Sequence, residues 1–311
     1  MEENTKGLDA GGKFEFPIIQ EQAGCGCGGD NAADADDSGS SLDQPFVSGS
    51  LSTPAGLLPK VSSRLTRQDR WGTIKARFGV GRMNYAVHPG LYALGEPDEN
   101  APVLVTANYK MSFDCLRQAL PGRNAWILVL DTKGINVWCA AGKGTFGTNE
   151  LVYRIEASGL KKVVSHRKIV LPQLGAPGVA AHQVKKFSGF KVHYGPVRAR
   201  DIPAYLDNGF TASKEMRIVT FPLADRAVLI PIELQGAAKP FALLSLALLV
   251  LAGILGRSGF QTNLLHDGLF AVVALFAAIF GGAVLTPLLL PWLPGRAFSV
   301  KGLSIGLVTA L

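Results

Sequence analysis

The sequence predicts a Rossmann-like α/β domain with a mostly parallel sheet, followed by a helical transmembrane domain. Apolar runs of strand length alternate with amphipathic stretches between residues 103 and 194, as in successive βαβ units. Two long uncharged stretches follow, each close to the ~20 residues that cross a bilayer. The first 58 residues show neither pattern. We therefore expect a tail over residues 1–58, the α/β domain over 59–235 and transmembrane helices over 236–311.

The tail is set apart by its charge. Residues 1–58 carry ten acidic and two basic side chains, whereas the whole chain has a net charge of +7, so the remainder carries +15. The tail is also rich in Gly, Ser and Asp, a composition that predicts disorder.

The α/β domain is predicted to alternate strands with helices. Strands are expected over residues 103–107, 126–130 and 190–194, another begins within 162–165, and helices are expected over 112–120 and 149–158. In open α/β sheets, ligands bind beyond the carboxyl ends of the strands. The loops that follow the strands should therefore converge on one edge, namely 108–111, 132–147, 172–179 and 195–198.

One of these loops carries the run Asn-Val-Trp-Cys-Ala-Ala-Gly-Lys over residues 136–143. Gly134 allows a tight turn after the strand, and Asn136 is a competent N-cap, so Cys139 is expected in the first turn of a helix. The helix dipole there favours the thiolate, which binds metals. On spacing alone, a small buried hydrophobe is the commoner role for such a cysteine. The run is neither a Walker A loop nor a Cys-x-x-Cys site.

The run at 136–143, together with residues 102–110, 171–181 and 194–200, resembles the HgcA family of corrinoid proteins of microbial mercury methylation. The resemblance covers roughly residues 58–235. It implies that the α/β domain binds a corrinoid, and that Cys139 is the lower axial ligand of the cobalt and the catalytic residue.

The resemblance also directs attention to residues around the macrocycle. Glycines let the backbone approach a flat ring, and threonines can hydrogen-bond its amide groups, although ordinary turn chemistry explains the glycines equally well. The predicted cofactor-binding residues are Asn136, Val137, Trp138, Cys139, Ala140, Gly142, Lys143, Gly144, Thr145, Thr106, Gly175 and Gly178. In the tail, Cys25 and Cys27 have a spacing able to hold soft Hg(II), or are an incidental pair.

The predicted function is methyl transfer from methyl-cobalt to inorganic Hg(II), giving methylmercury. The resemblance implies a ferredoxin-like [4Fe–4S] partner, HgcB, and a methyl donor such as methyltetrahydrofolate or its methyltransferase. Two alternatives stay open. One is a membrane-tethered corrinoid methyl carrier in anaerobic one-carbon and acetyl-CoA metabolism, and the other is a non-enzymatic scaffold with a structural Cys139.

The two uncharged stretches, Pro240–Gly256 and Leu269–Pro294, predict a membrane hairpin, although a buried core helix can be this apolar. Basic residues flank the pair on the outside, so the positive-inside rule places the α/β domain in the cytoplasm and the chain in the cytoplasmic membrane as a multi-pass protein. A third apolar stretch, residues 300–311, is too short to cross. We expect it to be an incomplete third span.

The basic remainder of the chain could serve a nucleic acid, an anionic membrane or a phosphate-bearing cofactor. No nucleic-acid-binding motif is present, so we expect no nucleic-acid partner. Residues 62–92 form a basic segment with aromatic residues before the α/β pattern. This segment is either a solvated amphipathic stretch or a surface that contacts anionic headgroups or an acidic redox partner. Cys115 is interpreted as a packing residue.

Overall fold

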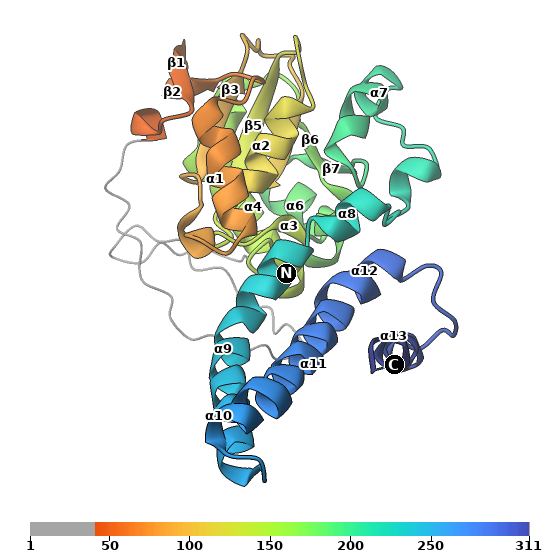
Figure 1. The fold of residues 1–311 in the computed structure, drawn as a ribbon. Coiled ribbons are helices and arrows are strands. Elements are labelled where there is room, and N and C mark those ends of the chain that lie inside the picture. Colours follow the sequence, from red (N-terminus) through yellow and green to blue (C-terminus); the bar gives the residue numbers. More distant parts are fainter. Residues whose placement is uncertain (1–40, 311) are drawn as a thin grey trace, which may run out of the picture. The chain divides into compact units, whose positions relative to one another are not determined.

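The computed structural model describes residues 41–310 (Figure 1). Among these residues the chain forms two compact units. The first contains residues 41–69 and 83–218, and the second contains residues 70–82 and 219–310. Cys25 and Cys27 lie outside the described residues, so their predicted role stays a prediction.

The first unit is built on one seven-stranded sheet with the order β1-β2-β3-β5-β4-β6-β7. The strands are β1 (Val47–Thr53), β2 (Gly56–Val61), β3 (Gly90–Leu94), β4 (Val103–Ala107), β5 (Ala125–Leu130), β6 (Lys168–Leu171) and β7 (Lys191–Tyr194). The strands from β5 to β7 are parallel, as expected, but β3 runs antiparallel to β5 and β1 antiparallel to β2. The sheet is therefore mixed, and its parallel part follows the predicted βαβ pattern.

Helices cover both faces of the sheet (Figure 1). The elements of this unit are η1 (Ser41–Asp43), η2 (Arg82–Asn84), α2 (Lys110–Gln118), α3 (Val137–Gly142), α4 (Thr148–Ala157), α5 (Leu160–Val163), η3 (Gln173–Gly178), α6 (Ala181–Ser188), η4 (Ala199–Asp201), α7 (Ile202–Asp207) and η5 (Glu215–Arg217); α1 (Arg67–Arg77) continues into the second unit. One buried cluster joins the sheet to α3, α4, α5 and α6, and the other joins it to α2 and α7.

Two sequence expectations were wrong. The tail was expected to be disordered to residue 58, but β1 and β2 form a hairpin whose turn is closed by Thr53, which donates to the carbonyl of Gly56 at 2.8 Å. Most side chains of β1 are exposed, so the strand lacks apolar alternation. The strand expected at 162–165 is instead α5, because Leu160 and Val163 are buried one turn apart; the strand begins at Lys168.

The chain order of the strands creates a switch point beside β4. From β4 the chain passes to β5 on one side, and it then crosses to β6 on the other side. The connection after β4 leads to β5 and the connection after β6 leads to β7, on opposite sides of the sheet, so a crevice forms beyond the carboxyl ends of β4 and β6, which is where such sheets bind ligands.

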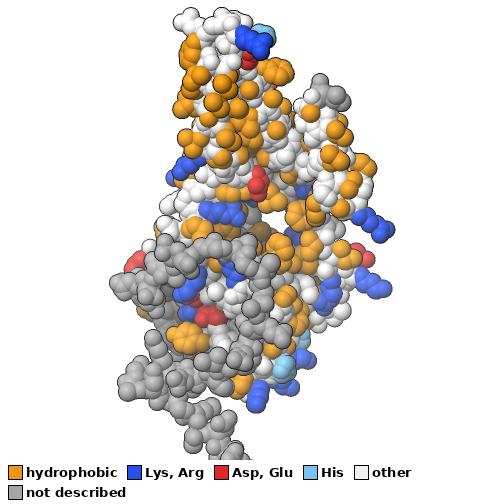
Figure 2. Space-filling model, turned by 90° about the horizontal axis from the view of Figure 1, so that it is seen from below, with side chains coloured by type: hydrophobic (Ala, Val, Ile, Leu, Met, Phe, Trp, Pro, Cys, Tyr) orange, Lys and Arg blue, Asp and Glu red, His pale blue; other side chains and the backbone are white. Residues whose placement is uncertain are grey.

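The second unit is helical and apolar. Its elements are α8 (Leu223–Ala227), α9 (Ile230–Leu255), α10 (Phe260–Asn263), the π-helical η6 (Leu264–Gly268), α11 (Leu269–Phe280), the π-helical η7 (Gly281–Leu285), α12 (Thr286–Leu289) and α13 (Phe298–Ala310). Two continuous helical stretches are long and apolar enough to cross a membrane, Leu223–Leu255 and Phe260–Leu289. Hydrophobic side chains cover most of their visible surface in Figure 2.

These two stretches pack as a hairpin. Phe241 and Phe276 meet with ring centroids 6.3 Å apart, and the backbone at Gly268 approaches Leu249. At the open end, the buried Arg226 donates to the carbonyls of Pro287 and Leu288. A cation at the last carbonyls of a helix satisfies groups that lack intrahelical partners. The end of the second stretch therefore lies beside the start of the first, as a hairpin requires.

Candidate functional site at the carboxyl edge of the sheet

The helix α3 begins as the sequence predicts. The side chain of Asn136 accepts a hydrogen bond from the backbone N–H of Cys139 at 2.9 Å, and Asn136 has extended backbone angles. Asn136 is therefore the N-cap, and Cys139 lies in the first turn. The helix has only six residues, so its position depends on this cap and on its contacts with the sheet.

The two sides of α3 differ sharply. Ala140 and Ala141 are buried against the core, whereas Trp138 is 69% exposed and Cys139 is exposed. The interpretation of Cys139 as a small buried hydrophobe is thus wrong. Cys115 on α2 is also exposed, which contradicts its interpretation as a packing residue. The indole of Trp138 and the thiol of Cys139 are therefore both accessible from solvent.

The loop that leads into α3 is held by a residue for which the sequence suggested no role. Asn108, just after β4, accepts hydrogen bonds from the N–H groups of Thr132 at 3.1 Å and Gly134 at 2.9 Å. The Thr132 hydroxyl lies 2.8 Å from the same oxygen of Asn108 and 2.7 Å from the carbonyl of Ile135, so its one proton can serve either. The sequence signal that could have indicated this role is the position of Asn108, a polar residue directly after the buried strand β4.

A second loop packs directly on α3. A Cβ at Gly178 would meet the carbonyl oxygen of Phe146 at 2.2 Å and Cα of Ala141 at 3.1 Å, and one at Gly175 would meet the Phe146 ring at 2.5 Å. Both glycines are therefore needed for the contact between η3 and the segment after α3. Their predicted contact with a macrocycle stays a prediction, since packing alone explains why these positions are Gly.

The exit of α3 is more open. A Cβ at Gly142 would meet no atom within 4 Å, and Lys143 is exposed. Gly144 has a φ of +79°, which favours glycine, and the Thr145 hydroxyl lies 3.5 Å from the carbonyl of Ala140. The residues from 142 to 145 therefore form an accessible turn whose backbone a large ligand can approach.

A small cavity of about 100 Å³ marks the switch point between β4 and β6. Thr106 of β4, Val137 of α3, Pro172 and Gly195 all contribute to its wall. They come from strand β4 and three of the expected loops, and the fourth loop supplies Asn108, which binds the loop before α3. The predicted convergence of the loops on one edge is confirmed.

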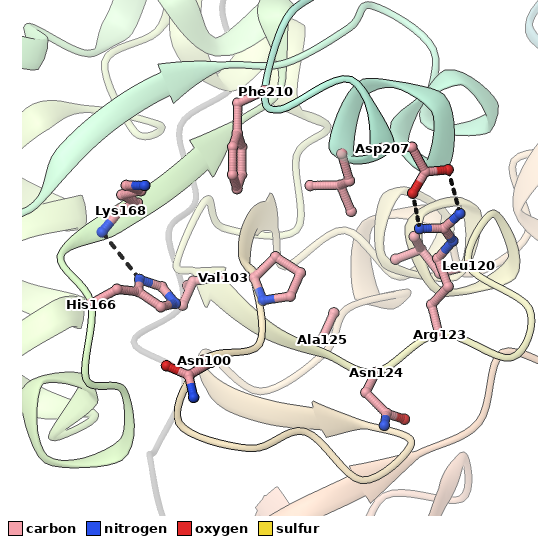
Figure 3. A pocket seen from close by; sticks show the side chains of 12 residues that line it. Asn100, Val103, Leu120, Arg123, Asn124, Ala125, His166, Lys168, Asp207 and Phe210 are labelled. Carbon is pink, nitrogen blue, oxygen red and sulfur yellow. Dashed lines mark hydrogen bonds and ion pairs between the residues drawn. The ribbon is translucent and has the colours of Figure 1, made fainter.

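A larger cavity, about 520 Å³, lies at the opposite edge, near the amino ends of the same strands (Figure 3). Its polar groups are mostly engaged. Arg123 makes two 2.7 Å hydrogen bonds with Asp207, and the ring nitrogens of His166 lie 3.2 Å from the N–H of Lys168 and 2.9 Å from the carbonyl of Ala101. These contacts leave neither Arg123 nor His166 free for chemistry, so we place the candidate site at the carboxyl edge.

Comparison with known proteins points to one group of complexes. Residues 78–206 match the family model of the CO dehydrogenase/acetyl-CoA synthase delta subunit. Curated relatives include acetyl-CoA decarbonylase/synthase complex gamma subunits from Methanopyrus kandleri (33% identity over 123 residues, 39% of this chain and 26% of the relative), Methanocaldococcus jannaschii (39% over 97, 30% and 20%) and Archaeoglobus fulgidus (30% over 143, 44% and 30%). The matched stretch spans between a fifth and a third of these relatives, and the family-model match includes every loop of the candidate site.

Proposed function

We propose that this chain is a membrane-tethered corrinoid protein that carries a methyl group, with Cys139 as the residue that would hold the cobalt. The similarity to acetyl-CoA decarbonylase/synthase subunits supports a role in methyl transfer within one-carbon metabolism. The observation that carries the proposal is the exposed thiol of Cys139 on α3, at the carboxyl edge of the sheet beside the switch point.

The residues at this edge fit a large flat cofactor. The cavity between β4 and β6 is too small to enclose a macrocycle, so a corrinoid would be held at the open edge of the sheet, where Trp138 and Cys139 are exposed. Among residues 41–310 there is no group of three or more His, Cys, Asp or Glu side chains that could hold a metal ion. A metal at Cys139 would therefore need to bring its other ligands with it, as the cobalt of a corrinoid does.

The roles of the protein groups follow from their positions. Asn108 and Asn136 fix the direction of α3, and thereby the place of the Cys139 sulfur. A bound corrinoid would supply the cobalt that holds the methyl group. The open turn at residues 142–145 would meet polar substituents at the rim of the ring, while the apolar hairpin would tether the domain to a membrane.

A visible absorption spectrum tests the cofactor assignment. The full chain, purified in detergent and incubated with methylcobalamin, should retain a coloured corrinoid through gel filtration. Cys139→Ala should shift the spectrum, because the lower ligand is lost. The matched control is Cys115→Ala, which removes the other exposed cysteine of the described residues and should leave the spectrum unchanged. A spectrum that is the same in all three proteins would contradict the assignment of Cys139.

Mercury methylation is the second candidate, favoured by the residue run 136–143 around Cys139. Mercury(II) is a soft electrophile that must accept the methyl group with its bonding electron pair, and a thiolate from Cys139 would donate electron density to the metal in a way that suits such a transfer. A ferredoxin-like [4Fe–4S] protein such as HgcB would return electrons, and a methyltetrahydrofolate-linked donor would restore the methyl group.

The two candidates differ in the acceptor. Purified chain loaded with the methylated cofactor can be offered Hg(II), and methylmercury is then measured against the amount of cofactor. Formation of methylmercury that depends on Cys139 supports the second candidate. Cofactor loading without any methylmercury leaves the methyl-carrier function and excludes the mercury reaction for this chain.

A further inference from the structure

Helix α1 presents its apolar side chains outward. Trp71, Ile74 and Phe78 follow one another at spacings of three and four residues, which places them on one face, and they are 58%, 43% and 51% exposed. Asp69 and Ala76, on another face, are buried. A helix of a soluble domain normally turns its apolar stripe toward the core. The outward stripe of α1 therefore lacks a partner among the described residues.

The C-terminal end of this stripe is fixed. Gly79 has a φ of +75°; its N–H donates to the carbonyl of Ala76 at 3.2 Å, and that of Val80 donates to the carbonyl of Lys75 at 2.9 Å. This pair of bonds is a Schellman motif, which ends a helix at a defined residue. Val80 is 62% exposed and extends the apolar surface beyond Phe78.

The same end packs on the helix that leads into the first apolar stretch. A Cβ at Gly79 would lie 3.0 Å from both Gln235 and Ile232 of α9, within the second unit. These residues precede the uncharged run at Pro240 by five and eight positions, about 8 and 12 Å along a helix. The headgroup layer is roughly 5–8 Å thick on each side of the hydrocarbon core. Gln235 would thus lie at the outer limit of the headgroup layer, with the end of α1 beside it.

The exposed charges of α1 beside the apolar stripe are positive and would attract an anionic surface. Arg70 and Lys75 are exposed beside the apolar stripe, and the ammonium group of Lys75 lies 5.9 Å from the centre of the Trp71 ring. The segment before α9 adds further exposed apolar side chains, Val219, Phe221, Leu223 and Leu229. Aromatic and basic side chains together are typical of helices that lie in the membrane interface.

We propose that the apolar surface formed by Trp71 and Ile74 of α1, with Phe78 and Val80 just after its end, lies in the headgroup layer of a membrane with anionic lipids. This inference rests on the membrane tether proposed above. The apolar side chains would enter the boundary of the acyl chains, and Arg70 and Lys75 would bind the headgroup phosphates. The helix would then hold residues 70–82 at a defined depth instead of leaving the tether to the hairpin alone.

Tryptophan quenching in vesicles measures this depth in the full chain. The protein is reconstituted into phosphatidylcholine vesicles with or without phosphatidylglycerol, using brominated phospholipids as quenchers. The contribution of each Trp is the difference between the wild type and its Trp→Phe variant. Trp71 should lose most of its emission to brominated lipid, more so with phosphatidylglycerol, and should resist aqueous acrylamide. Trp138, which is also exposed, is the reference for an indole open to solvent and should be quenched by acrylamide before reconstitution.

Trp292, three residues beyond the helical stretch Phe260–Leu289, distinguishes the proposal about α1 from the proposed membrane tether. Lipid quenching of Trp292 without quenching of Trp71 would overturn the inference about α1 and leave the tether in place. If lipid quenches neither Trp71 nor Trp292, both the inference about α1 and the proposed membrane tether are wrong. Protection of Trp71 from both quenchers would point to a protein occupant, and exposure to acrylamide after deletion of residues 1–40 would identify that occupant as the acidic tail.

A charge variant tests the lipid preference separately. Arg70→Glu combined with Lys75→Glu should remove the effect of phosphatidylglycerol on Trp71 quenching, and high salt should do the same in the wild type. The control is Lys185→Glu combined with Lys186→Glu on α6 of the first unit, which changes the net charge equally. An unchanged phosphatidylglycerol effect in the α1 variant would overturn the electrostatic part of the proposal.

Discussion

Asn108 and Thr132, 24 positions apart, form a buried bridge in which one side-chain oxygen receives the backbone N–H of the other residue at 3.1 Å. Asn108 directly follows strand β4, and Thr132 lies in the loop after β5. The bridge thus ties the ends of adjacent parallel strands together where the chain turns toward α3. Because Cys139 follows within seven residues, its position depends on a side chain from a neighbouring strand.

Replacement of Asn108 by Ala should destabilise the first unit. The change leaves the N–H groups of Thr132 and Gly134 without a partner in a buried place, at a cost of ~1–3 kcal/mol for each such group. Thermal unfolding of the full chain in detergent, followed by circular dichroism, measures the change. Asn149→Ala, on the exposed side of α4, is the control and should shift the midpoint little. Equal shifts would contradict the role of Asn108.

Loss of the N-cap should act on α3 alone. Asn136→Ala removes the hydrogen bond to the N–H of Cys139, worth ~1 kcal/mol, and should lower corrinoid retention because the six-residue helix can then move away from the ring. Asn136→Asp keeps an acceptor at the cap and should retain the cofactor. Retention is read from absorbance after gel filtration. Full retention by the Ala variant would make Asn136 an ordinary turn residue.

The contact between η3 and α3 is tested with two glycines. Gly178→Ala would place a methyl group 2.2 Å from the carbonyl oxygen of Phe146, so the loop must shift, and we expect a loss of ~1–3 kcal/mol in stability. Gly142→Ala is the control, because a Cβ there would meet nothing within 4 Å. A stable Gly178→Ala protein that loses its corrinoid would show instead that this glycine faces the cofactor, as the sequence predicted.

The sequence predicted the parts of the fold whose signal is local. The strand over 103–107, the buried strand ending at Leu130 and the cap at Asn136 are all found, because each depends on neighbouring residues. The hairpin of β1 and β2 was missed because β1 is mostly exposed and lacks apolar alternation. Asn108 was missed for another reason. Its partners are distant in sequence, and only the pairing of β4 with β5 brings them together.

A buried charge cluster should govern stability in acid. Burial alone would raise the pKa of Asp69, but hydrogen bonds and charge from Lys110, the N–H of Thr66 and Arg117 hold that pKa well below its usual value. A lowered pKa means that the carboxylate stabilises the fold fully above its unfolded pKa, ~3.9, and loses this effect as the pH falls below that value.

Asp69→Asn tests this cluster. The variant leaves the buried Lys110 and Arg117 with Asp114 as their remaining carboxylate, so we expect a loss of ~3–5 kcal/mol at neutral pH and a flatter fall of stability below pH ~4. The midpoint of thermal unfolding, measured from pH 7 downward, gives both quantities. Asp207→Asn, which breaks the exposed pair with Arg123, is the control and should change the midpoint much less. Similar acid slopes in wild type and Asp69→Asn would contradict the assignment.

A truncated chain tests whether the apolar hairpin takes part in cofactor binding. A stop after Ala238 keeps Ile232 and Gln235 against Gly79 and removes both uncharged stretches. All candidate cofactor loops precede this point, so the truncated protein should bind corrinoid with the spectrum of the full chain and with the same dependence on Cys139. In cells it should lose activity if the tether keeps a reductase partner close, because tethering raises effective concentration without changing the chemistry. If the purified truncated protein folds but fails to bind the corrinoid, the hairpin helps to form the cofactor site, and its role as a simple tether is wrong.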